Sequence, residues 1–354
     1  MSSRSAGLRL GQFAYKPRIP IIQTSTFTTS RHNQVSDTLK AEAQRNNQKF
    51  KLENLLNVKD KGMHSLPWFR PHLTNIVALI TGGGTGIGLM AAQALAVNGA
   101  KVYITGRTPE KLERVAELYG QNIPGSIVPV PADVTSKESI GNLVQTVSER
   151  ESHLSILINN AGISSHPQTT EYDNAPDLRK SLFDDPVATF KEWEDTYRTD
   201  VSQLFFMTTA FLPLLSKGSE VQHGWSSTVL NISSISGIVK TAQHHFAYNA
   251  SKAASIHLTK MLAQEISGSP ASRLPIRVNN IAPGVFPSEM TAGESDELQK
   301  NYIPASKYEQ KVPARRAGRE EDMAGAVLFA TTNQYLNGQT VVVDGGYVLA
   351  AGSV

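Results

Sequence analysis

The chain of 354 residues contains no cysteine, and its apolar residues never form a long uninterrupted run. The absence of cysteine excludes disulfide bonds, a thiol nucleophile and a thiolate metal site. No run reaches the ~18 apolar residues that a helix needs to cross a bilayer, so we expect no membrane span. The nine histidines form no H-x-x-x-H pair, and we predict no metal site.

Acidic residues are missing from the start of the chain. Residues 1–36 hold five Arg or Lys and ten Ser or Thr but no Asp or Glu, a composition typical of organellar transit peptides. The stretch STFTTSRH, Ser25–His32, is similar to the region around mitochondrial presequence cleavage sites. We therefore predict a basic N-terminal extension over residues 1–49 and a mitochondrial location. A cytoplasmic protein with a biased tail is the alternative.

The basic charge belongs to this end of the chain. Residues 1–72 hold 12 Lys and Arg against 4 Asp and Glu, whereas the remainder holds 22 against 27. The body is therefore mildly acidic and carries no basic patch of the kind that binds nucleic acid. We expect no nucleic-acid partner.

Strand-like runs alternate with helix-like segments through the body of the chain. Continuous apolar runs are typical of strands that are buried on both faces of a parallel sheet. Pro109 and Gly120 bracket one helix, and Thr135 with Glu138 matches a capping box that opens another. The alternation predicts an α/β fold, a doubly wound parallel sheet with helices on both faces. The runs occur at residues 77–81, 101–105, 126–134, 154–160, 227–233 and 275–283.

The first strand-like run leads into the glycine-rich turn TGGGTGIG, Thr81–Gly88, and a helix follows. Glycines permit a tight turn and let the backbone approach a pyrophosphate. The N-terminus of the next helix adds N–H groups and the positive end of its dipole. This strand–turn–helix context predicts a dinucleotide-binding site.

The end of the second strand distinguishes between the two nicotinamide dinucleotides. NAD binding usually uses an acidic residue there to hold the ribose hydroxyls. Here the strand ends in Gly106-Arg107, and no carboxylate occurs between Gly88 and Glu110. A guanidinium is suited to a 2′-phosphate, so the sequence favours NADP(H) over NAD(H).

Tyr248 and Lys252 are four residues apart in the stretch YNASK. On a helix, residues at this spacing lie on the same face. An ordinary phenol is a poor acid or base at neutral pH, and a neighbouring ammonium favours its ionised form. The spacing fits either a proton-transfer pair or an exposed pair on a solvated helix.

Several motifs, in order along the chain, resemble those of the short-chain dehydrogenase/reductase family. The resemblance runs from about Phe50 to the C-terminus and is nearest to 3-oxoacyl-carrier-protein-reductase-like enzymes, especially fungal-type members. It implies one domain over residues 50–354 with a Rossmann-type, mostly seven-stranded parallel sheet, and a homodimer or homotetramer. The matching motifs are the glycine turn, Asp133-Val134, Asn159-Asn160-Ala161-Gly162, Ser234 in NISS, Tyr248 with Lys252, Pro283-Gly284, and NGQTVVVDGGY near the C-terminus.

The resemblance also implies an activity, that of an NADP(H)-dependent oxidoreductase that reduces a ketone or oxidises a secondary alcohol. A 3-oxoacyl thioester is one candidate substrate. Tyr248 would transfer the proton, Lys252 would hold the nicotinamide ribose, and Ser234 would stabilise charge on the substrate oxygen. The implied cofactor-binding residues are Gly82, Thr85, Gly86, Ile87, Gly88, Arg107, Asp133, Val134, Asn160, Ala161, Gly162, Tyr248, Lys252, Pro283, Gly284, Phe286 and Ser288.

The chain departs from the family pattern at Asp200. The family places an Asn seven residues after a Trp, and counting from Trp193 that position is Asp200. We retain Asp200 as a candidate catalytic residue. We expect its carboxylate to pair with Lys252, to raise the lysine pKa and to weaken its use as a proton shuttle.

A second departure is the segment Gly62–Ile76, which interrupts the family's usual lead-in to the first strand. Removing it would join NVKDK directly to VALITGGG. One hypothesis is therefore that the segment is a translated intron, and the alternative is a surface loop. Detection of a peptide from within residues 64–70 in the native protein would exclude the first.

Two other functions stay open. One is a non-catalytic NADP(H)-binding redox sensor or scaffold, for which Asp200 is the best support. The other is an NAD-linked alcohol dehydrogenase, which Arg107 disfavours. We expect the regions 163–192 and 286–311 to line the substrate site. We interpret His244-His245 as polar surface, and Trp193, Trp225, Phe205 and Phe206 as core residues.

Overall fold

The computed structural model describes residues 35–55 and 73–354, except residues 222, 269, 271–272 and 354. These residues belong to one compact unit that begins at Val35. The N-terminal region 1–34, with its predicted transit peptide, lies outside the described residues, as does most of the segment Gly62–Ile76.

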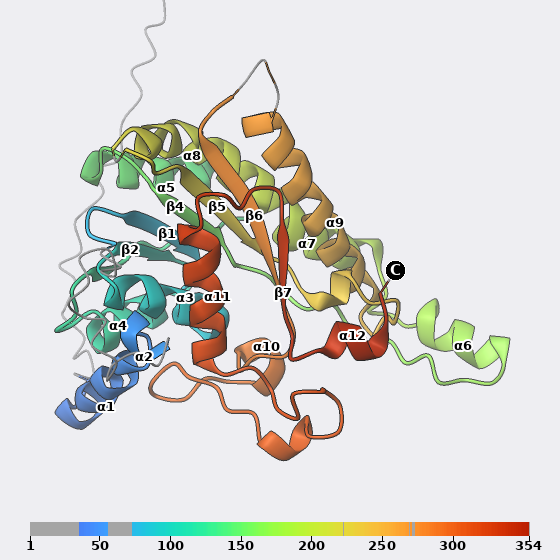
Figure 1. Ribbon diagram of the computed structural model, residues 1–354. Coiled ribbons are helices and arrows are strands. Elements are labelled where there is room, and N and C mark those ends of the chain that lie inside the picture. The colour runs from blue at the N-terminus through green and yellow to red at the C-terminus, as the bar shows by residue number, and fades with distance from the viewer. Residues whose placement is uncertain (1–34, 56–72, 222, 269, 271–272, 354) are drawn as a thin grey trace, which may run out of the picture. The chain divides into compact units, whose positions relative to one another are not determined.

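Seven strands form one sheet in which every neighbouring pair is parallel (Figure 1), as predicted. The order across the sheet is β3-β2-β1-β4-β5-β6-β7. All residues of β1, β4, β5 and β6 are buried, which explains their continuous apolar runs. The strands are β1 (Val77–Thr81), β2 (Lys101–Thr105), β3 (Ser126–Pro129), β4 (Ile156–Asn159), β5 (Ser227–Ile232), β6 (Ile276–Pro283) and β7 (Thr340–Val343).

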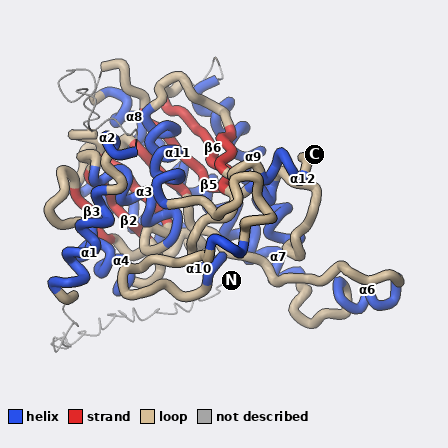
Figure 2. The backbone as a smooth tube through the Cα atoms, turned by 60° about the horizontal axis from the view of Figure 1, so that its bottom comes forward, coloured by secondary structure: helices blue, strands red, loops and turns tan. Residues whose placement is uncertain are grey.

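Helices cover both faces of the sheet (Figures 1 and 2). Alternate residues of a strand point to opposite faces, and β1 divides accordingly. Ala78 and Ile80 belong to one apolar core, and Val77 and Leu79 belong to the other. The first core contains α3 (Gly86–Val97), α4 (Pro109–Tyr119) and α11 (Glu320–Thr332), and the second contains α5 (Lys137–Arg150), α8 (Gln203–Glu220) and α9 (Phe246–Ala263).

Strand β1 lies between β2 and β4, so the winding of the chain reverses at this point. In open parallel sheets such a reversal leaves a crevice at the carboxyl ends of the two strands that diverge. The glycine turn follows β1, and the NNAG motif follows β4. The fold therefore brings these two motifs to the same edge of the sheet.

The chain between β4 and α8 makes a long excursion. Figure 1 shows α6 (Ala175–Leu182) lying well away from the sheet. The chain returns through α7 (Phe190–Tyr197) and the π-helical turn Arg198–Ser202 into α8. Short helices α10 (Glu289–Ala292) and α12 (Tyr347–Ala351) follow β6 and β7.

The compact unit starts earlier than the predicted boundary at Phe50. Helix α1 (Asp37–Gln48) begins after Ser36, whose hydroxyl caps it by accepting from the Leu39 N–H at 3.3 Å. This helix packs on α4, and α2 (Leu52–Leu55) packs on α11. Part of the predicted N-terminal extension is therefore folded onto the sheet domain.

Two local predictions are wrong. The N-cap of α5 is Ser136, whose hydroxyl accepts from the Ser139 N–H at 3.3 Å. The hydroxyl of Thr135 donates instead to Asp133 at 2.7 Å, which removes it from the predicted capping box.

The second wrong prediction is that four aromatic residues all lie in the core. Trp193, Phe205 and Phe206 are 40%, 45% and 39% exposed, so they are not core residues. Trp225 alone of the four packs against the core, as predicted.

The end of the Gly62–Ile76 segment is described, and it belongs to the folded domain. Leu73 and Ile76 are each 4% exposed within the core. The Leu73 N–H donates to the carbonyl oxygen of Asn98 at 3.0 Å.

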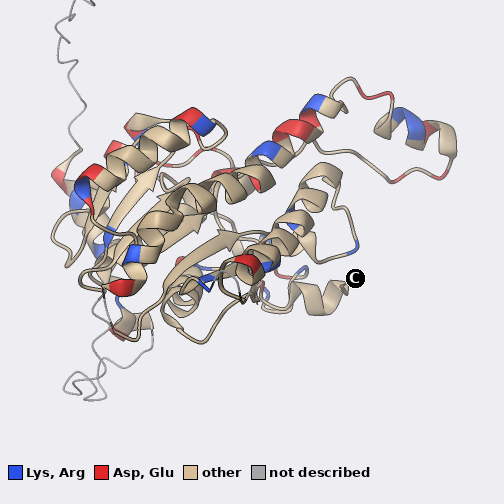
Figure 3. Cartoon of the chain, turned by 90° about the horizontal axis from the view of Figure 1, so that it is seen from above, with Lys and Arg blue, Asp and Glu red and all other residues tan. Residues whose placement is uncertain are grey.

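No helix in the described residues is long and apolar enough to cross a membrane. Figure 3 shows acidic and basic residues interspersed along the helices.

Candidate active site

The glycine turn has the backbone geometry that its sequence predicts. Gly82 has φ +65°, in the left-handed region that side chains rarely adopt. A Cβ on Gly88 would lie 2.1 Å from the carbonyl oxygen of Gly82, so a larger residue cannot fit there. Helix α3 begins at Gly86 and directs its first N–H groups toward the space beside the turn.

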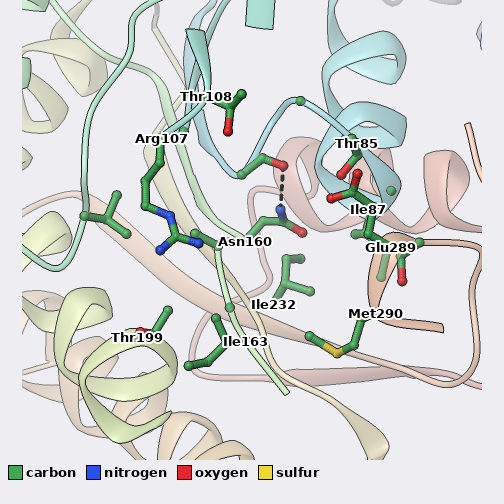
Figure 4. A pocket seen from close by; sticks show the side chains of 18 of the residues that line it. Thr85, Ile87, Arg107, Thr108, Asn160, Ile163, Thr199, Ile232, Glu289 and Met290 are labelled. Carbon is green, nitrogen blue, oxygen red and sulfur yellow. Dashed lines mark hydrogen bonds between the residues drawn. The ribbon is translucent and has the colours of Figure 1, made fainter. Parts of the chain in front are cut away.

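The NNAG motif is bound to the glycine turn by four hydrogen bonds. The Asn160 amide donates to the carbonyl oxygens of Thr81 and Gly82 at 2.9 and 3.1 Å. The N–H groups of Asn160 and Ala161 both donate to the Thr81 hydroxyl at 2.9 Å. Figure 4 shows Asn160 and one of these bonds. The two loops at the switch point are thus joined into one wall.

These loops enclose a cavity of about 340 Å³, within the range of small-ligand sites. Thirteen predicted site residues line it: Gly82, Thr85, Gly86, Ile87, Arg107, Asp133, Val134, Asn160, Ala161, Gly162, Tyr248, Lys252 and Ser288. Ile163, Glu289 and Met290 also line it, within the regions expected to line the substrate site, and Gly84 belongs to the predicted glycine turn. Lining residues that no motif indicated are Gly106, Thr108, Lys111, Leu112, Ala132, Thr135, Thr199, Ile232 and Ser233.

Charged side chains are among the residues that line the cavity. Figure 4 shows the Arg107 side chain extended along the cavity wall. Within the described part of the chain, Arg107 forms no ion pair. Nearby, burial alone would raise the pKa of Asp133, but hydrogen bonds from Thr135 and the charge of Arg107 outweigh it and lower that pKa. Elsewhere in the lining, Lys111 Nζ lies 2.6 Å from a carboxylate oxygen of Glu289.

Tyr248 and Lys252 lie on α9 and line the same cavity. Lys252 Nζ is 5.3 Å from the centroid of the Tyr248 ring. The pair is therefore not on a solvated helix face, which was the open alternative. Only 5% of the Lys252 side chain is exposed.

Asp200 lies on the π-helical turn, and such turns are frequent at functional sites. Its carboxylate is 3.5 Å from Lys252 Nζ and fully buried. One oxygen accepts from the Ile163 N–H at 2.9 Å, and the other accepts from the Ser251 hydroxyl at 3.1 Å. The carboxylate therefore connects the end of the NNAG motif with two residues of α9.

The expected effect of Asp200 on its partner is present. Burial alone would lower the pKa of Lys252, but the carboxylate of Asp200 and the phenol of Tyr248 outweigh it, and the net shift is upward. Lys252 is therefore a charged ammonium at neutral pH.

Ser234 is 9% exposed and lies beside the cavity rather than in its lining. Its hydroxyl oxygen accepts from the Ser236 N–H at 3.1 Å, so its proton is free to donate. The following turn is pressed against α9, because a Cβ on Gly237 would lie 2.5 Å from the backbone of Lys252 and Ala253. The neighbouring Ser233 hydroxyl is occupied, since it donates to Asn280 at 2.7 Å.

Four other predicted residues do not line the cavity. Gly88 lies beneath the glycine turn, and Pro283 ends β6. Gly284 packs against Asp344, because a Cβ on Gly284 would lie 2.7 Å from the Cα of Asp344. The Phe286 side chain is 3% exposed in the core, so its predicted cofactor contact is not made by that ring.

One of the two expected substrate regions, residues 163–192, contacts the His244-His245 turn. His245 Nδ1 lies 2.9 Å from the carbonyl oxygen of Ser165, and the Gln168 N–H donates to the carbonyl oxygen of His244 at 2.7 Å. These two histidines therefore join the excursion after β4 to the segment before α9. In the described residues, no group of three or more acidic or histidine side chains is arranged to hold a metal ion.

Comparison with known proteins gives consistent matches. The short chain dehydrogenase family model matches residues 76–299. The chain is 37% identical over 279 residues to the short-chain dehydrogenase/reductase PhomF of Diaporthe leptostromiformis, over 77% of this chain and 90% of that protein. It is 33% identical over 285 residues to the rhamnolipids biosynthesis 3-oxoacyl-[acyl-carrier-protein] reductase of Pseudomonas aeruginosa, over 80% of this chain and 99% of that protein.

Solved structures that are similar to this chain belong to the same class of enzymes as these relatives. The Pseudomonas aeruginosa RhlG/NADP active-site complex has a TM-score of 0.63 at 30% identity, over 78% of this chain and 98% of that one. The NADPH-dependent 3-quinuclidinone reductase from Rhodotorula rubra has a TM-score of 0.61 at 28% identity, over 79% and 94%. The chain therefore belongs to the short-chain dehydrogenase/reductase family.

Proposed function

We propose that this protein is an NADP(H)-dependent oxidoreductase that reduces a ketone, or oxidises a secondary alcohol, with Ser234, Tyr248 and Lys252. The observation that carries the proposal is that the glycine turn, Tyr248 and Lys252 line one cavity. A dinucleotide site and a proton-transfer pair thus face the same space. A protein that only binds a dinucleotide has no use for the proton-transfer pair.

The residues at the glycine turn fit a dinucleotide. Gly82 and Gly88 keep side chains out of the space beside the turn, and the N-terminus of α3 offers N–H groups to a pyrophosphate. Arg107 is available for a 2′-phosphate because it pairs with no described carboxylate, which favours NADP(H) over NAD(H). When bound, the reduced cofactor supplies a hydride.

The remaining residues handle the proton and the substrate oxygen. Tyr248 gives its proton to the carbonyl oxygen in reduction and takes the alcohol proton in oxidation. The ammonium of Lys252 stabilises negative charge on that phenol, and it can also hold the nicotinamide ribose. Ser234, with its proton free, hydrogen-bonds the substrate oxygen and stabilises the charge that develops there.

A 3-oxoacyl thioester is the first substrate class to test. Two observations support it: the chain resembles 3-oxoacyl reductases, and one curated relative is named as such an enzyme. The excursion after β4 and the segment after α10 are built from loops and short helices that would shape the substrate site.

The second candidate function is a redox sensor that binds NADP(H) without turnover. The buried pair of Asp200 and Lys252 favours it, because a lysine held by a carboxylate is a poor proton shuttle. The sensor predicts tight NADPH binding with no turnover of any ketone, so one assay separates the two functions.

We propose further that the protein self-associates through α7 and α8. Trp193, Phe205 and Phe206 expose large aromatic surfaces on these two helices. Aromatic residues of this kind are enriched in interfaces. The predicted homodimer or homotetramer would cover them.

A mitochondrial location is also proposed, from the composition of residues 1–36. The compact unit begins at Val35, so cleavage near residue 32 would leave α1 intact. The N-terminal sequence of the mature protein, determined from isolated mitochondria, tests this. An intact Met1 terminus on the cytosolic protein would contradict it.

The test of the activity is NADPH oxidation by the purified full-length protein, followed by absorbance against a panel of ketones led by a 3-oxoacyl thioester. We expect turnover with at least one member of the panel. Tight NADPH binding without turnover would favour the sensor. Faster turnover with NADH would overturn the cofactor preference.

A further inference from the structure

The N-terminal helices are a part of this chain that the family match does not include. The matched region is residues 76–299, whereas α1 and α2 precede it and Lys300 directly follows it. The helices are firmly attached, because the Asn47 amide donates to the carbonyl oxygen of Tyr119 at 3.0 Å. Phe50 is fully buried, and its carbonyl oxygen accepts from the Asn98 amide at 2.9 Å.

Lys300 lies at the centre of this attachment. Its Nζ is 2.5 Å from a carboxylate oxygen of Glu320, at the start of α11. The same Nζ is 5.4 Å from the ring centroid of Phe50 and 5.1 Å from that of Tyr119. Only 15% of the Lys300 side chain is exposed. A cation in such a position attracts both ring faces as well as the carboxylate.

Helix α1 reaches Lys300 through Glu320 and through Gln93. The Asn46 amide donates to the second carboxylate oxygen of Glu320 at 3.1 Å. The Gln93 side chain donates to Asn46 at 3.0 Å and to Asn47 at 2.8 Å, and it accepts from Lys300. Burial alone would raise the pKa of Glu320, but Lys300 outweighs it and the net shift is downward, so this carboxylate is ionised. At Lys300 burial outweighs the attraction of the same carboxylate, and the pKa of the ammonium is lowered.

On its other side, Lys300 belongs to a tight turn that leads to the cofactor cavity. The Lys300 N–H donates to the Asp296 carboxylate at 2.8 Å, and the Asp296 N–H donates back to the Lys300 carbonyl oxygen at 2.9 Å. The neighbouring Ser295 hydroxyl bonds to Asn301 at 3.2 Å and to Glu289 at 3.1 Å. Glu289 lines the cavity and pairs with Lys111, which also lines it.

We propose that Lys300 is a positioning residue for cofactor binding. It ties the N-terminal helices to the segment 293–301 and thereby holds Glu289 in the lining of the cavity. Lys300 itself does not line the cavity, so it acts through this segment. The inference rests on the proposed cofactor site. It adds that residues before the matched family region help to set the affinity for the dinucleotide.

The test uses the full-length protein with Lys300→Met, which removes the charge and keeps a long side chain. The dissociation constant for NADPH is measured by fluorescence titration, beside kcat, KM for NADPH and thermal unfolding. We expect the dissociation constant and KM to rise about fivefold, with kcat unchanged. The matched control is Lys40→Met, which removes the 3.0 Å ion pair of α1 with Glu117 on α4. It should leave NADPH affinity unchanged.

A second variant covers the outcome in which Lys300→Met does not fold. Ser295→Ala removes only the hydroxyl that joins Glu289 to Asn301, and it should weaken NADPH binding about threefold. A lower melting temperature with unchanged NADPH affinity in both variants would overturn the inference and leave Lys300 a purely structural residue. Absence of NADPH binding by the wild-type protein would overturn the proposed function, and the inference with it.

Discussion

Lys252 and Asp200 form a buried ion pair, with Nζ 3.5 Å from the carboxylate. Taking two charges out of water is costly, and a pair of this kind persists only when its geometry satisfies both groups. The carboxylate also accepts from the Ile163 N–H and the Ser251 hydroxyl. Asp200 thus helps to raise the pKa of Lys252 and to hold the lysine beside Tyr248.

Asp200→Asn keeps the shape of this residue and removes its charge. The variant should lose about 1–3 kcal/mol of unfolding free energy at neutral pH, the range for a charged hydrogen-bonded partner. Denaturant titration measures this. When the pH is raised, the variant should also lose activity at a lower pH than the wild-type protein does, because Lys252 no longer has the carboxylate that raises its pKa.

The pH dependence of stability follows from the same pair. The folded-state pKa of Lys252 lies above its unfolded value of 10.5. Its stabilising contribution is therefore complete below that pH and is lost as the pH rises through the folded pKa. Wild type and Asp200→Asn should converge in stability only in strongly alkaline solution. An equal difference at every pH would contradict the assignment.

Arg107→Ala tests the cofactor preference. Loss of a charged hydrogen bond to a 2′-phosphate should raise KM for NADPH about tenfold to hundredfold, with KM for NADH unchanged. Steady-state kinetics with both cofactors measure this, and Arg150→Ala on the exposed face of α5 is the control. Equal losses with the two cofactors would mean that Arg107 does not contact the 2′-phosphate.

Gly88→Ala tests the glycine turn. Its new Cβ would lie 2.1 Å from the Gly82 carbonyl oxygen, so the turn must shift and NADPH binding should be lost. Gly141→Ala on α5 is the matched control, because a Cβ there meets nothing within 4 Å. It should stabilise the protein by about 0.5–1 kcal/mol. Calorimetry with and without NADPH compares the two, and normal binding by Gly88→Ala would refute this geometry.

The exposed aromatic residues make a prediction about assembly. Sedimentation of the wild-type protein should show a dimer or tetramer. The double variant Trp193→Ser/Phe205→Ser should shift it toward the monomer. Tyr335→Ser, at a fully exposed side chain outside this surface, should not. A wild-type monomer at micromolar concentration would remove the proposed role of α7 and α8.

The strands were the part of the fold most open to prediction. Continuous apolar runs gave residues 77–81 and 101–105 at their observed bounds, because burial on both faces leaves little choice of residue type. The spacing of residues on α8 could have prevented the wrong prediction for Phe205 and Phe206. On α8 the buried residues Leu204, Met207 and Phe211 repeat at helical spacing, and Phe205 and Phe206 fall off that face.

The candidate site was also predicted only in part. Residues in motifs were found, and Glu289 lies in a region that was expected to line the site. Lys111 and its pairing with Glu289 were missed because nothing local relates the two residues: they are brought together only by the return of the chain after β6. The network around Lys300 was equally hidden, since its members come from α1, α3, α4 and α11. The contact of Asp200 with Lys252 was predicted because the resemblance supplied the pairing.

The most direct test of the account is the rate of NADPH oxidation by Tyr248→Phe with a ketone that the wild-type protein reduces. Tyr335→Phe, at a fully exposed tyrosine outside the cavity lining and outside the expected substrate regions, is the control. The account predicts that Tyr248→Phe binds NADPH normally and loses at least about a hundredfold in kcat, while Tyr335→Phe retains full activity. Normal turnover by Tyr248→Phe would contradict the assignment of this residue as the proton donor.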